Sequence, residues 1–508
     1  MVTRTIDPNH RRLGPDGATR ARRPTSGVLA CALLATIAIA TQLAGQVAAD
    51  AARRPNVVVI LTDDQRYDTL WSMPNVRSML MDRGVYFPNA FVPNALCCPS
   101  RVSILTGLHS HTNGVYWNGP PRGGFAAFDD RASIATVLDD AGYRTGFVGK
   151  YLNGYVGASY DNYGYVPPGW DRWFAVPTGS YYDYQAASDG AKTGIYGTDP
   201  GDYSARVMTR VARSFVETAS GDPFFLFYSA AAPHSSPRPT EEGKAAVPGP
   251  MDVDTMSLLP TWRPSSYGTW DDVSDMPQYI QRHGWGSKTG ERVDLLRQRQ
   301  LESLASLDRQ IGRLLEALPA NTLVIFLSDN GYLWGEHRWT SKQVPYEESI
   351  RIPLIVTWPG RVPQGVDSRL ALNIDVVPTI LAAVGSSPGT PTGVDAASGL
   401  PVAPEGLDLL GEERRPAFVL EHGTQKHGSG AVPGYCGVRT AGWMWVRYSD
   451  AGSDDDGFVE MYDVVSDPLQ QHNLADVAAF APERRGLRAL AKDLCAPTPP
   501  GFSWSVPR

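Results

Sequence analysis

Five short strand-like runs, four of them mostly apolar and partly β-branched, most constrain what this chain can fold into. Runs that are apolar at successive positions are typical of strands buried on both faces of a parallel sheet. They occupy residues 56–61, 144–148, 223–228, 323–327 and 352–357. Helical patterns lie between or after them, at residues 134–141, 203–220, 292–318 and 374–384. This order predicts an α/β chain with a large, mostly parallel central sheet flanked by helices.

Polar residues follow each of the first four runs within six residues. They are Asp63 and Asp64 after the first run, Lys150 after the second, His234 after the third, and Asp329 and Asn330 after the fourth. Each has an ordinary explanation as a solvated turn, a helix cap, a surface lysine or a structural histidine. Ligands of open α/β sheets bind at the carboxyl ends of the strands, however, so four such ends in succession predict one site.

A reactive loop entering a short helix is predicted at residues 96–107. Pro99 suits the first helical position and Gly107 suits the residue just past the end, which places Cys97 in front of the helix N-terminus. Such a place favours an anion or a nucleophile of lowered pKa, and Arg101 adds charge one turn further on. A buried cysteine pair beside a structural arginine is the alternative.

The string Cys97-Cys98-Pro99-Ser100-Arg101, followed by Leu-Thr-Gly at 105–107, resembles the signature of the type I sulfatases. The resemblance runs from about residue 56 to residue 494 and implies an alkaline-phosphatase-like sandwich. It also implies that a formylglycine-generating enzyme oxidises Cys97 to formylglycine. On this resemblance, one hydroxyl of the hydrated aldehyde would attack sulfur, and the second would expel sulfate and restore the aldehyde.

The same resemblance assigns roles to the other site residues. Asp63, Asp64, Asp329 and Asn330 would hold a divalent metal together with residue 97, and their oxygen ligands favour Ca²⁺ over zinc. Lys150 and Lys342 match the two active-site lysines, His234 matches the group that protonates the departing alcohol, and Arg101 helps to neutralise charge. Many sulfatases carry a histidine where this chain has Leu152. The base of the last step is therefore unassigned, with Asn153 as a structural substitute.

Residues 154–185 are rich in Tyr, Gly, Pro and Trp and are predicted to be an ordered loop. Exposed aromatic side chains near a pocket suit stacking on sugar rings. With the Gly-Lys-Tyr-Leu-Asn string at 149–153, this stretch resembles the sulfatases that act on 6-sulfated N-acetylglucosamine, including the extracellular heparan-editing enzymes. The Pro-rich residues 237–283 are predicted to be an insertion that shapes the substrate cleft.

Residues 1–49 are predicted to be a signal peptide. Several arginines precede an apolar run at 28–40, and Val-Ala-Ala at 47–49 reads as a cleavage site. That run is too short for a comfortable membrane span, so we expect no stable span after processing and a location in the medium or outside the cell envelope. In an exported chain, Cys436 and Cys495 can pair.

The mature chain is predicted to comprise a catalytic domain at 50–405 and a smaller α+β domain at 406–508, joined by a Pro/Gly/Ser-rich linker at 385–404. The net charge of -7 argues against a nucleic-acid binder but allows a local site for a sulfated carbohydrate. Two alternatives stay open. One is a phosphoester or phosphonate hydrolase on the same scaffold, and the other is a noncatalytic, calcium-dependent binder of sulfated glycan in which Cys97 stays a thiol.

Overall fold

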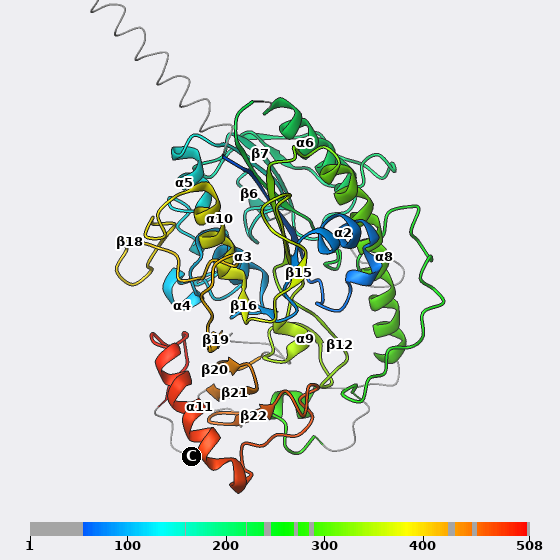
Figure 1. Cartoon of the computed structure of the whole chain (residues 1–508). Coiled ribbons are helices and arrows are strands. Elements are labelled where there is room, and N and C mark those ends of the chain that lie inside the picture. The colour runs from blue at the N-terminus through cyan, green and yellow to red at the C-terminus, as the bar shows by residue number, and fades with distance from the viewer. Residues whose placement is uncertain are drawn as a thin grey trace, which may run out of the picture. The chain divides into compact units, whose positions relative to one another are not determined.

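The core of the structure is a mixed ten-stranded sheet with helices on either side (Figure 1). The order of its strands is β15-β2-β14-β11-β1-β10-β4-β7-β8-β9. The five central strands run parallel to one another. They are β11 (Thr322–Ser328), β1 (Asn56–Thr62), β10 (Phe224–Ser229), β4 (Arg144–Lys150) and β7 (Arg172–Val176). The outer strands are β15 (Gly365–Val366), β2 (Val85–Tyr86), β14 (Leu354–Thr357), β8 (Ala187–Ser188) and β9 (Ala191–Lys192).

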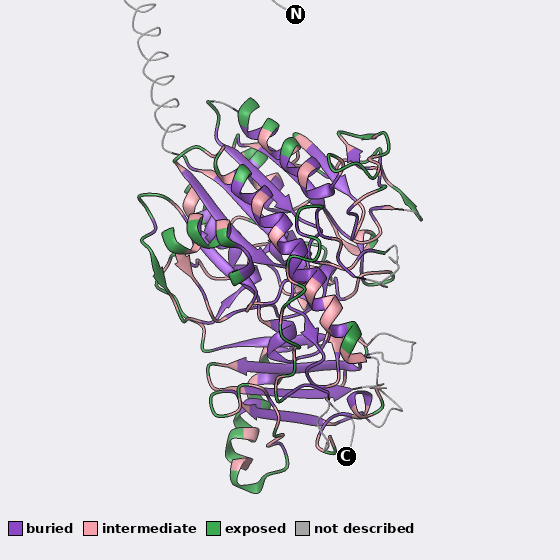
Figure 2. Cartoon of the chain, turned by 90° about the vertical axis from the view of Figure 1, so that its right-hand side faces the viewer, coloured by how far each residue is buried: buried purple, intermediate pink, exposed green. Residues whose placement is uncertain are grey.

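Both faces of the sheet are covered, which explains why the middle of each central strand is largely apolar. Val57, Val59 and Leu61 of β1 pack into one hydrophobic core, whereas Val58 and Ile60 pack into the other. The first core contains residues of α3 (Cys97–Thr106), α5 (Ile134–Asp140) and α10 (Val376–Val384). The second contains residues of α2 (Pro74–Met79), α6 (Ser204–Thr218) and α8 (Thr289–Leu315). Figure 2 shows the central strands buried between these layers.

The computed structural model describes residues 54–157, 159–219, 221–237, 245–268, 273–283, 289–424, 432–449 and 455–504. The predicted signal peptide at 1–49 lies outside these residues, and so do parts of the predicted insertion at 237–283. Among the helices in the described ranges, none is long and apolar enough to cross a membrane.

The predicted strands and helices are present, with two differences. The run at 352–357 forms β14, which pairs antiparallel with β11. The one helix in the chain between these two strands is the short α9 (Glu347–Ile350), whereas parallel neighbours normally need a longer crossover helix. The prediction of a loop throughout 154–185 was also wrong, because β7 lies within it and joins the sheet beside β4.

A separate antiparallel sheet follows the central domain. It consists of β19 (Ala417–His422), β20 (Gly434–Thr440), β21 (Trp443–Ser449) and β22 (Val459–Asp463), and α11 (Ala481–Leu494) packs on it. A disulfide joins Cys436 of β20 to Cys495 just after α11, a pairing that the sequence had left open. Residues 54–508 form one compact unit by contacts, so the domain boundary at 405 stays a prediction.

Short elements complete the described fold. They are β3 (Ala90–Phe91) with β16 (Ala371–Leu372), β5 (Val156–Gly157) with β6 (Tyr160–Asp161), β12 (Leu333–Trp334) with β13 (Thr340–Ser341), β17 (Gly393–Val394) with β18 (Pro401–Val402), and the helices α4 (Ser110–Asn113) and α7 (Gln278–Gln281).

A buried carboxyl group ties the C-terminal sheet to the central domain. Glu460 of β22 accepts hydrogen bonds from the hydroxyl groups of Tyr346 at 2.8 Å, Tyr462 at 2.6 Å and Tyr448 at 2.5 Å. Burial raises the pKa of Glu460 to about 7, although the three hydroxyl donors oppose the shift. Tyr346 immediately precedes α9 in the central domain, so this network fixes one part of the chain against the other.

We expect Glu460→Ala to lower the free energy of unfolding by about 3 kcal/mol or more, since several buried hydroxyl groups would lose their acceptor at roughly 1–3 kcal/mol each. Glu460→Gln keeps an acceptor oxygen and should cost only about 1 kcal/mol. Urea denaturation of both variants checks that Glu460→Ala loses more free energy of unfolding than Glu460→Gln. Equal and small effects would show that this network does not hold the two sheets together.

Candidate active site

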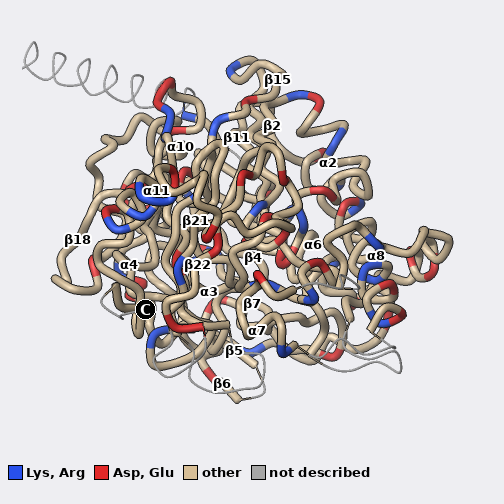
Figure 3. The backbone as a smooth tube through the Cα atoms, turned by 90° about the horizontal axis from the view of Figure 1, so that it is seen from below, with Lys and Arg blue, Asp and Glu red and all other residues tan. Residues whose placement is uncertain are grey.

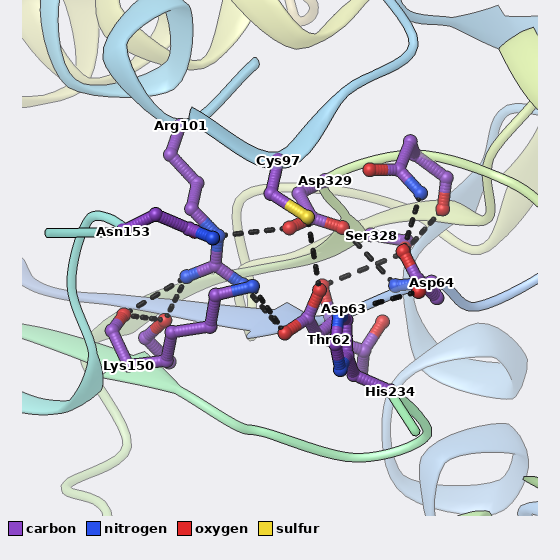
Figure 4. A network of polar contacts seen from close by, with 12 residues as sticks. Thr62, Asp63, Asp64, Cys97, Arg101, Lys150, Asn153, His234, Ser328 and Asp329 are labelled. Atoms are coloured by element: carbon purple, nitrogen blue, oxygen red, sulfur yellow. Dashed lines mark hydrogen bonds and ion pairs between the residues drawn. The ribbon is translucent and has the colours of Figure 1, made fainter. Parts of the chain in front are cut away.

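The carboxyl ends of four neighbouring strands meet at one edge of the central sheet. In sheet order they are β11, β1, β10 and β4, and they deliver the polar residues that the sequence analysis singled out. Cys97 and Arg101 reach the same place from α3 (Figure 4). The structure thus gathers residues from distant parts of the chain into one buried cluster, and Lys342 joins them from the loop after β13.

Three carboxylates form the base of the cluster. Asp63, Asp64 and Asp329 are almost fully buried, and a ligand oxygen from each lies within 4.8 Å of the others. Asp64 has a positive φ of 70° and its backbone N–H donates to Asp329 Oδ1 at 3.1 Å. This backbone conformation is uncommon for a residue with a side chain and aims Asp64 back toward the cluster.

Asn330 adds a further oxygen. Its Nδ2 donates to Asp64 Oδ1 at 2.7 Å and to the Gly331 carbonyl at 2.8 Å. Its Oδ1 is buried and has no hydrogen-bond partner among the described residues. A buried acceptor without a donor is costly unless a cation or water meets it. Three carboxylates and a spare amide oxygen are hard ligands, so the residues fit a divalent cation such as Ca²⁺.

Two buried lysines neutralise the carboxylates in the structure. Lys150 Nζ lies 2.5 Å from Asp63 Oδ2, and Lys342 Nζ pairs with Asp64 Oδ1. Although burial alone would raise the pKa of Asp63, Lys150 and its other positive neighbours bring it below the usual range. Burial and the charge of Asp63 instead raise the pKa of Asp329 to about 6. The carboxylates therefore differ in proton affinity although they share one site.

Arg101 holds the elements of the site together. Its Nε donates to Asp329 Oδ2 at 2.8 Å, and its Nη1 donates to the Lys150 carbonyl at 2.9 Å and to Ser229 Oγ at 2.7 Å. One guanidinium group thus links α3 to the ends of β11, β4 and β10. Its Nη2 lies 3.7 Å from Asp63 Oδ2 and makes no hydrogen bond to the described residues.

Cys97 is the first residue of α3, whereas the sequence analysis placed the helix start at Pro99. Its Sγ lies 2.7 Å from Lys342 Nζ and 3.6 Å from Asp63 Oδ1. Burial raises the pKa of the thiol to about 12, and Asp63 adds to this effect while the lysines oppose it. The expectation of a lowered pKa for this nucleophile is therefore wrong for the encoded thiol, because complete burial outweighs the nearby positive charge.

His234 lies on the other side of the carboxylates. Its Nε2 is 3.9 Å from Asp64 Oδ2, and its Nδ1 is 2.6 Å from the Ser235 carbonyl, to which it can only donate. Nε2 is consequently the atom that can take up and release a proton. Burial lowers the pKa of His234 even though Asp63 and Asp64 act in the opposite direction.

The position of the absent family histidine is apolar. Leu152 is 4% exposed and packs in the core, whereas the next residue, Asn153, donates its backbone N–H to Cys98 Sγ at 3.1 Å. The sequence analysis missed Asn118, whose Oδ1 accepts the backbone N–H of Cys98 at 2.9 Å. It satisfies a free donor in the first turn of α3, and no local sequence signal marks it.

A cavity of about 620 Å³ lies near His234, because Tyr181 and Ser236 belong to its lining. Asn118 and Asn153 line it on the Cys98 side, and Tyr181, which donates its hydroxyl to the His234 carbonyl at 2.7 Å, lines it on the other. The aromatic segment supplies much of this wall. Several of its rings are packed inside the protein, however, contrary to the expectation of exposed stacking residues; Tyr155 and Trp173, for example, are at most 1% exposed.

A second group of potential ligands lies at α4. His109 Nδ1 is 2.9 Å from Glu405 Oε2, and His111 Nδ1 is 3.0 Å from Glu421 Oε2. Thr112 Oγ1 also donates to Glu405 at 2.6 Å. Because the polar groups of this cluster satisfy one another, we interpret it as a hydrogen-bonded clasp, the histidine clasp, between the start of α4, Glu405 just after the linker, and β19.

The site has the charge balance of a centre that handles an anionic ester. Three fixed cations, Lys150, Lys342 and Arg101, face three carboxylates, and a divalent cation held by the carboxylates would leave the centre net positive. Acidic and basic residues are interspersed over the described chain (Figure 3), so any attraction for an anion is local to the site. The fold and the site together therefore define a hydrolase of negatively charged esters.

Comparison with known proteins identifies the family. Residues 55–386 match the sulfatase family, and residues 335–494 match the family described as N-sulphoglucosamine sulphohydrolase, C-terminal. The chain belongs to the sulfatase family of sulfuric ester hydrolases. As the resemblance implied, the structure combines an alkaline-phosphatase-like central sheet with a smaller C-terminal sheet.

Individual relatives agree with this assignment. A putative extracellular sulfatase Sulf-1 homolog of Caenorhabditis elegans is 32% identical over 65% of this chain, which spans 46% of that relative's length. The N-acetylglucosamine-6-sulfatase of Capra hircus is 29% identical over 84% of this chain and 81% of its own. A solved protein in complex with its substrate D-glucosamine-2-N,6-O-disulfate has the same fold, with a TM-score of 0.69, 23% identity and coverage of 87% of this chain and 98% of its own.

We expect Arg101→Met to destabilise the protein by about 3–5 kcal/mol, because it leaves the buried Asp329 carboxylate without its partner. Arg131→Met is the matched control, since Arg131 pairs with Asp129 on the surface and should not change the unfolding midpoint measurably. Chemical denaturation of both variants tests this role. A stable Arg101→Met variant would show that Arg101 is not needed to join the strand ends.

Proposed function

We propose that this chain is an exported, calcium-dependent sulfatase that acts on a sulfated sugar through a formylglycine at position 97. One observation carries the proposal. Residue 97 opens a fully buried helix and projects between Lys342 and Asp63, directly beside the carboxylate cluster. A group held there meets both positive charge and the hard ligands of a metal, which is what attack on an anionic ester requires.

The encoded thiol does not suit this role. Its pKa is raised to about 12 by burial, so little thiolate is present at neutral pH. Formylglycine, as its hydrate, supplies an oxygen nucleophile for sulfur and a second hydroxyl for releasing sulfate. The formylglycine-generating enzyme is accordingly a required partner during maturation.

The side chains around residue 97 neutralise the charge of the ester and protonate the leaving group. Lys150 and Lys342 offset the charge of the sulfate group, and Arg101 Nη2 offers a buried donor beside them. Cleavage of the S–O bond leaves an alkoxide on the sugar, which needs a proton. His234 Nε2 can hold that proton, and its lowered pKa makes the protonated ring a stronger acid.

Asp63, Asp64, Asp329 and Asn330 would hold the calcium ion, and the unpartnered Asn330 Oδ1 supports this ligand set. Such an ion would supply Lewis-acid polarisation and would offset negative charge beside residue 97. Lys150 and Lys342 lie beside the same carboxylates and supply the positive charge for the sulfate group.

The substrate class comes from the relatives. Their names point to 6-sulfated glucosamine units, and the cavity beside His234 is of a size that small ligands occupy. Export is supported by the signal-like segment at 1–49 and by the Cys436–Cys495 disulfide, since disulfides persist in oxidising compartments.

Peptide mass spectrometry on protein purified from its native host tests the central step. We expect position 97 to carry the aldehyde or its hydrate, while the adjacent buried Cys98 stays a thiol and serves as an internal control. Cys97→Ala and Lys342→Ala should each lower the turnover of 6-sulfated N-acetylglucosamine by about 10³-fold or more without unfolding the protein.

Two other outcomes would support the alternative functions. An unmodified thiol with tight glycan binding and no turnover would indicate a noncatalytic binder. A turnover of phosphonate or phosphate esters far above that of sulfate esters would indicate the other hydrolase on this scaffold.

Metal analysis tests the second part of the proposal. We expect about one equivalent of Ca²⁺ per chain, with activity lost on chelation and restored by Ca²⁺ rather than Zn²⁺. At a concentration of 100 times its dissociation constant, Ca²⁺ should stabilise the fold by about 2.7 kcal/mol, which thermal unfolding can detect. Asp64→Asn should abolish this stabilisation, whereas Glu405→Gln in the histidine clasp should leave it intact. Equal losses in both variants would contradict the assigned ligand set.

A further inference from the structure

The cavity beside His234 has a distinct chemical character, and we call it the tyrosine pocket. The tyrosines that line it are Tyr160, Tyr163, Tyr181, Tyr182 and Tyr184. Tyr160 is 48% exposed, so part of its ring is open to a ligand. Aromatic faces and phenolic hydroxyl groups together suit a sugar ring, which presents C–H groups on its faces and hydroxyl groups on its edge.

A single lysine carries the positive charge of this pocket among its described lining residues. Lys192 lies on β9, the last strand of the central sheet, and its Nζ is 4.4 Å from the centroid of the Tyr163 ring. No carboxylate of the described residues lies within 4.0 Å of it. A cation held over an aromatic ring is oriented without being neutralised. Asp183 is the one acidic residue in the described lining.

The positive charges at the reacting centre and in the tyrosine pocket lie at different places, so they can bind different anionic groups of one substrate. Lys150 and Lys342 are buried at the reacting centre, whereas Lys192 is exposed and lines the tyrosine pocket. A substrate with one sulfate group at the centre would leave Lys192 without an anionic partner. A substrate with a second anionic group on the same sugar or its neighbour would engage both regions.

We propose that the tyrosine pocket holds the sulfated sugar and that Lys192 binds a second anionic substituent, a sulfate or a carboxylate, so that the enzyme selects doubly anionic substrates. The inference rests on the proposed sulfatase activity. It assigns specificity to a residue on an edge strand that takes no part in the chemical step.

The test compares two substrates, D-glucosamine-2-N,6-O-disulfate and N-acetylglucosamine 6-sulfate, by release of the 6-sulfate. We expect wild-type enzyme to have a higher kcat/KM for the first, and Lys192→Met to lower the ratio of the two values roughly tenfold through KM. Lys192→Arg should keep the ratio. High salt should reduce the wild-type ratio and leave that of Lys192→Met little changed, because the contact is exposed.

Lys492→Met is the matched control, because Lys492 also lies over an aromatic ring, at 5.7 Å from the centroid of Trp504, but on α11. It should behave as wild type. An unchanged ratio in Lys192→Met, or no wild-type preference, would overturn the inference while the sulfatase activity stands. If wild-type enzyme in which Cys97 is fully converted to formylglycine releases sulfate from neither sugar, the proposed function is overturned instead.

Discussion

The compensation of buried charge at one edge of the central sheet is the constraint on which the rest of the structure depends. Three carboxylates sit almost without solvent contact, and each would be strongly destabilising alone. Each is paired with a cation from a different element: Asp63 with Lys150, Asp64 with Lys342, and Asp329 with Arg101. The groups proposed to perform catalysis are therefore also the groups that fix β1, β4, β11 and α3 relative to one another.

The C-terminal sheet supports this edge from outside. Tyr435 of β20 donates its hydroxyl to the Gln343 carbonyl at 3.1 Å, next to Lys342. Trp117 Nε1 donates to the Gly423 carbonyl at 3.1 Å, next to Asn118. Together with the Glu460 network, these contacts hold loops that carry site residues although the sheet itself supplies none of the charged groups at the centre. The C-terminal sheet therefore stabilises the positions of those loops.

The parts of this structure that local sequence patterns determine could be predicted from the sequence. Apolar runs predicted the central strands because both faces of the sheet are covered, and the polar residues after four of them lie at a common edge. Lys342 was found only through the family resemblance, since its partners Asp64 and Cys97 are far away in the sequence. The raised pKa of Cys97, the helix contact of Asn118 and the strand β7 within an aromatic segment depend on tertiary packing, which no local pattern contains.

The burial of α3 also bears on the order of events during maturation. Residue 97 is 0% exposed, and all ten residues of its helix are buried. Another enzyme could not reach this side chain in the folded protein without opening the cluster of charges that surrounds it. If Cys97 is oxidised as proposed, the reaction must compete in time with folding, and chains that close first would remain permanently inactive. The active fraction would then report the relative rates of modification and folding rather than the stability of the finished enzyme.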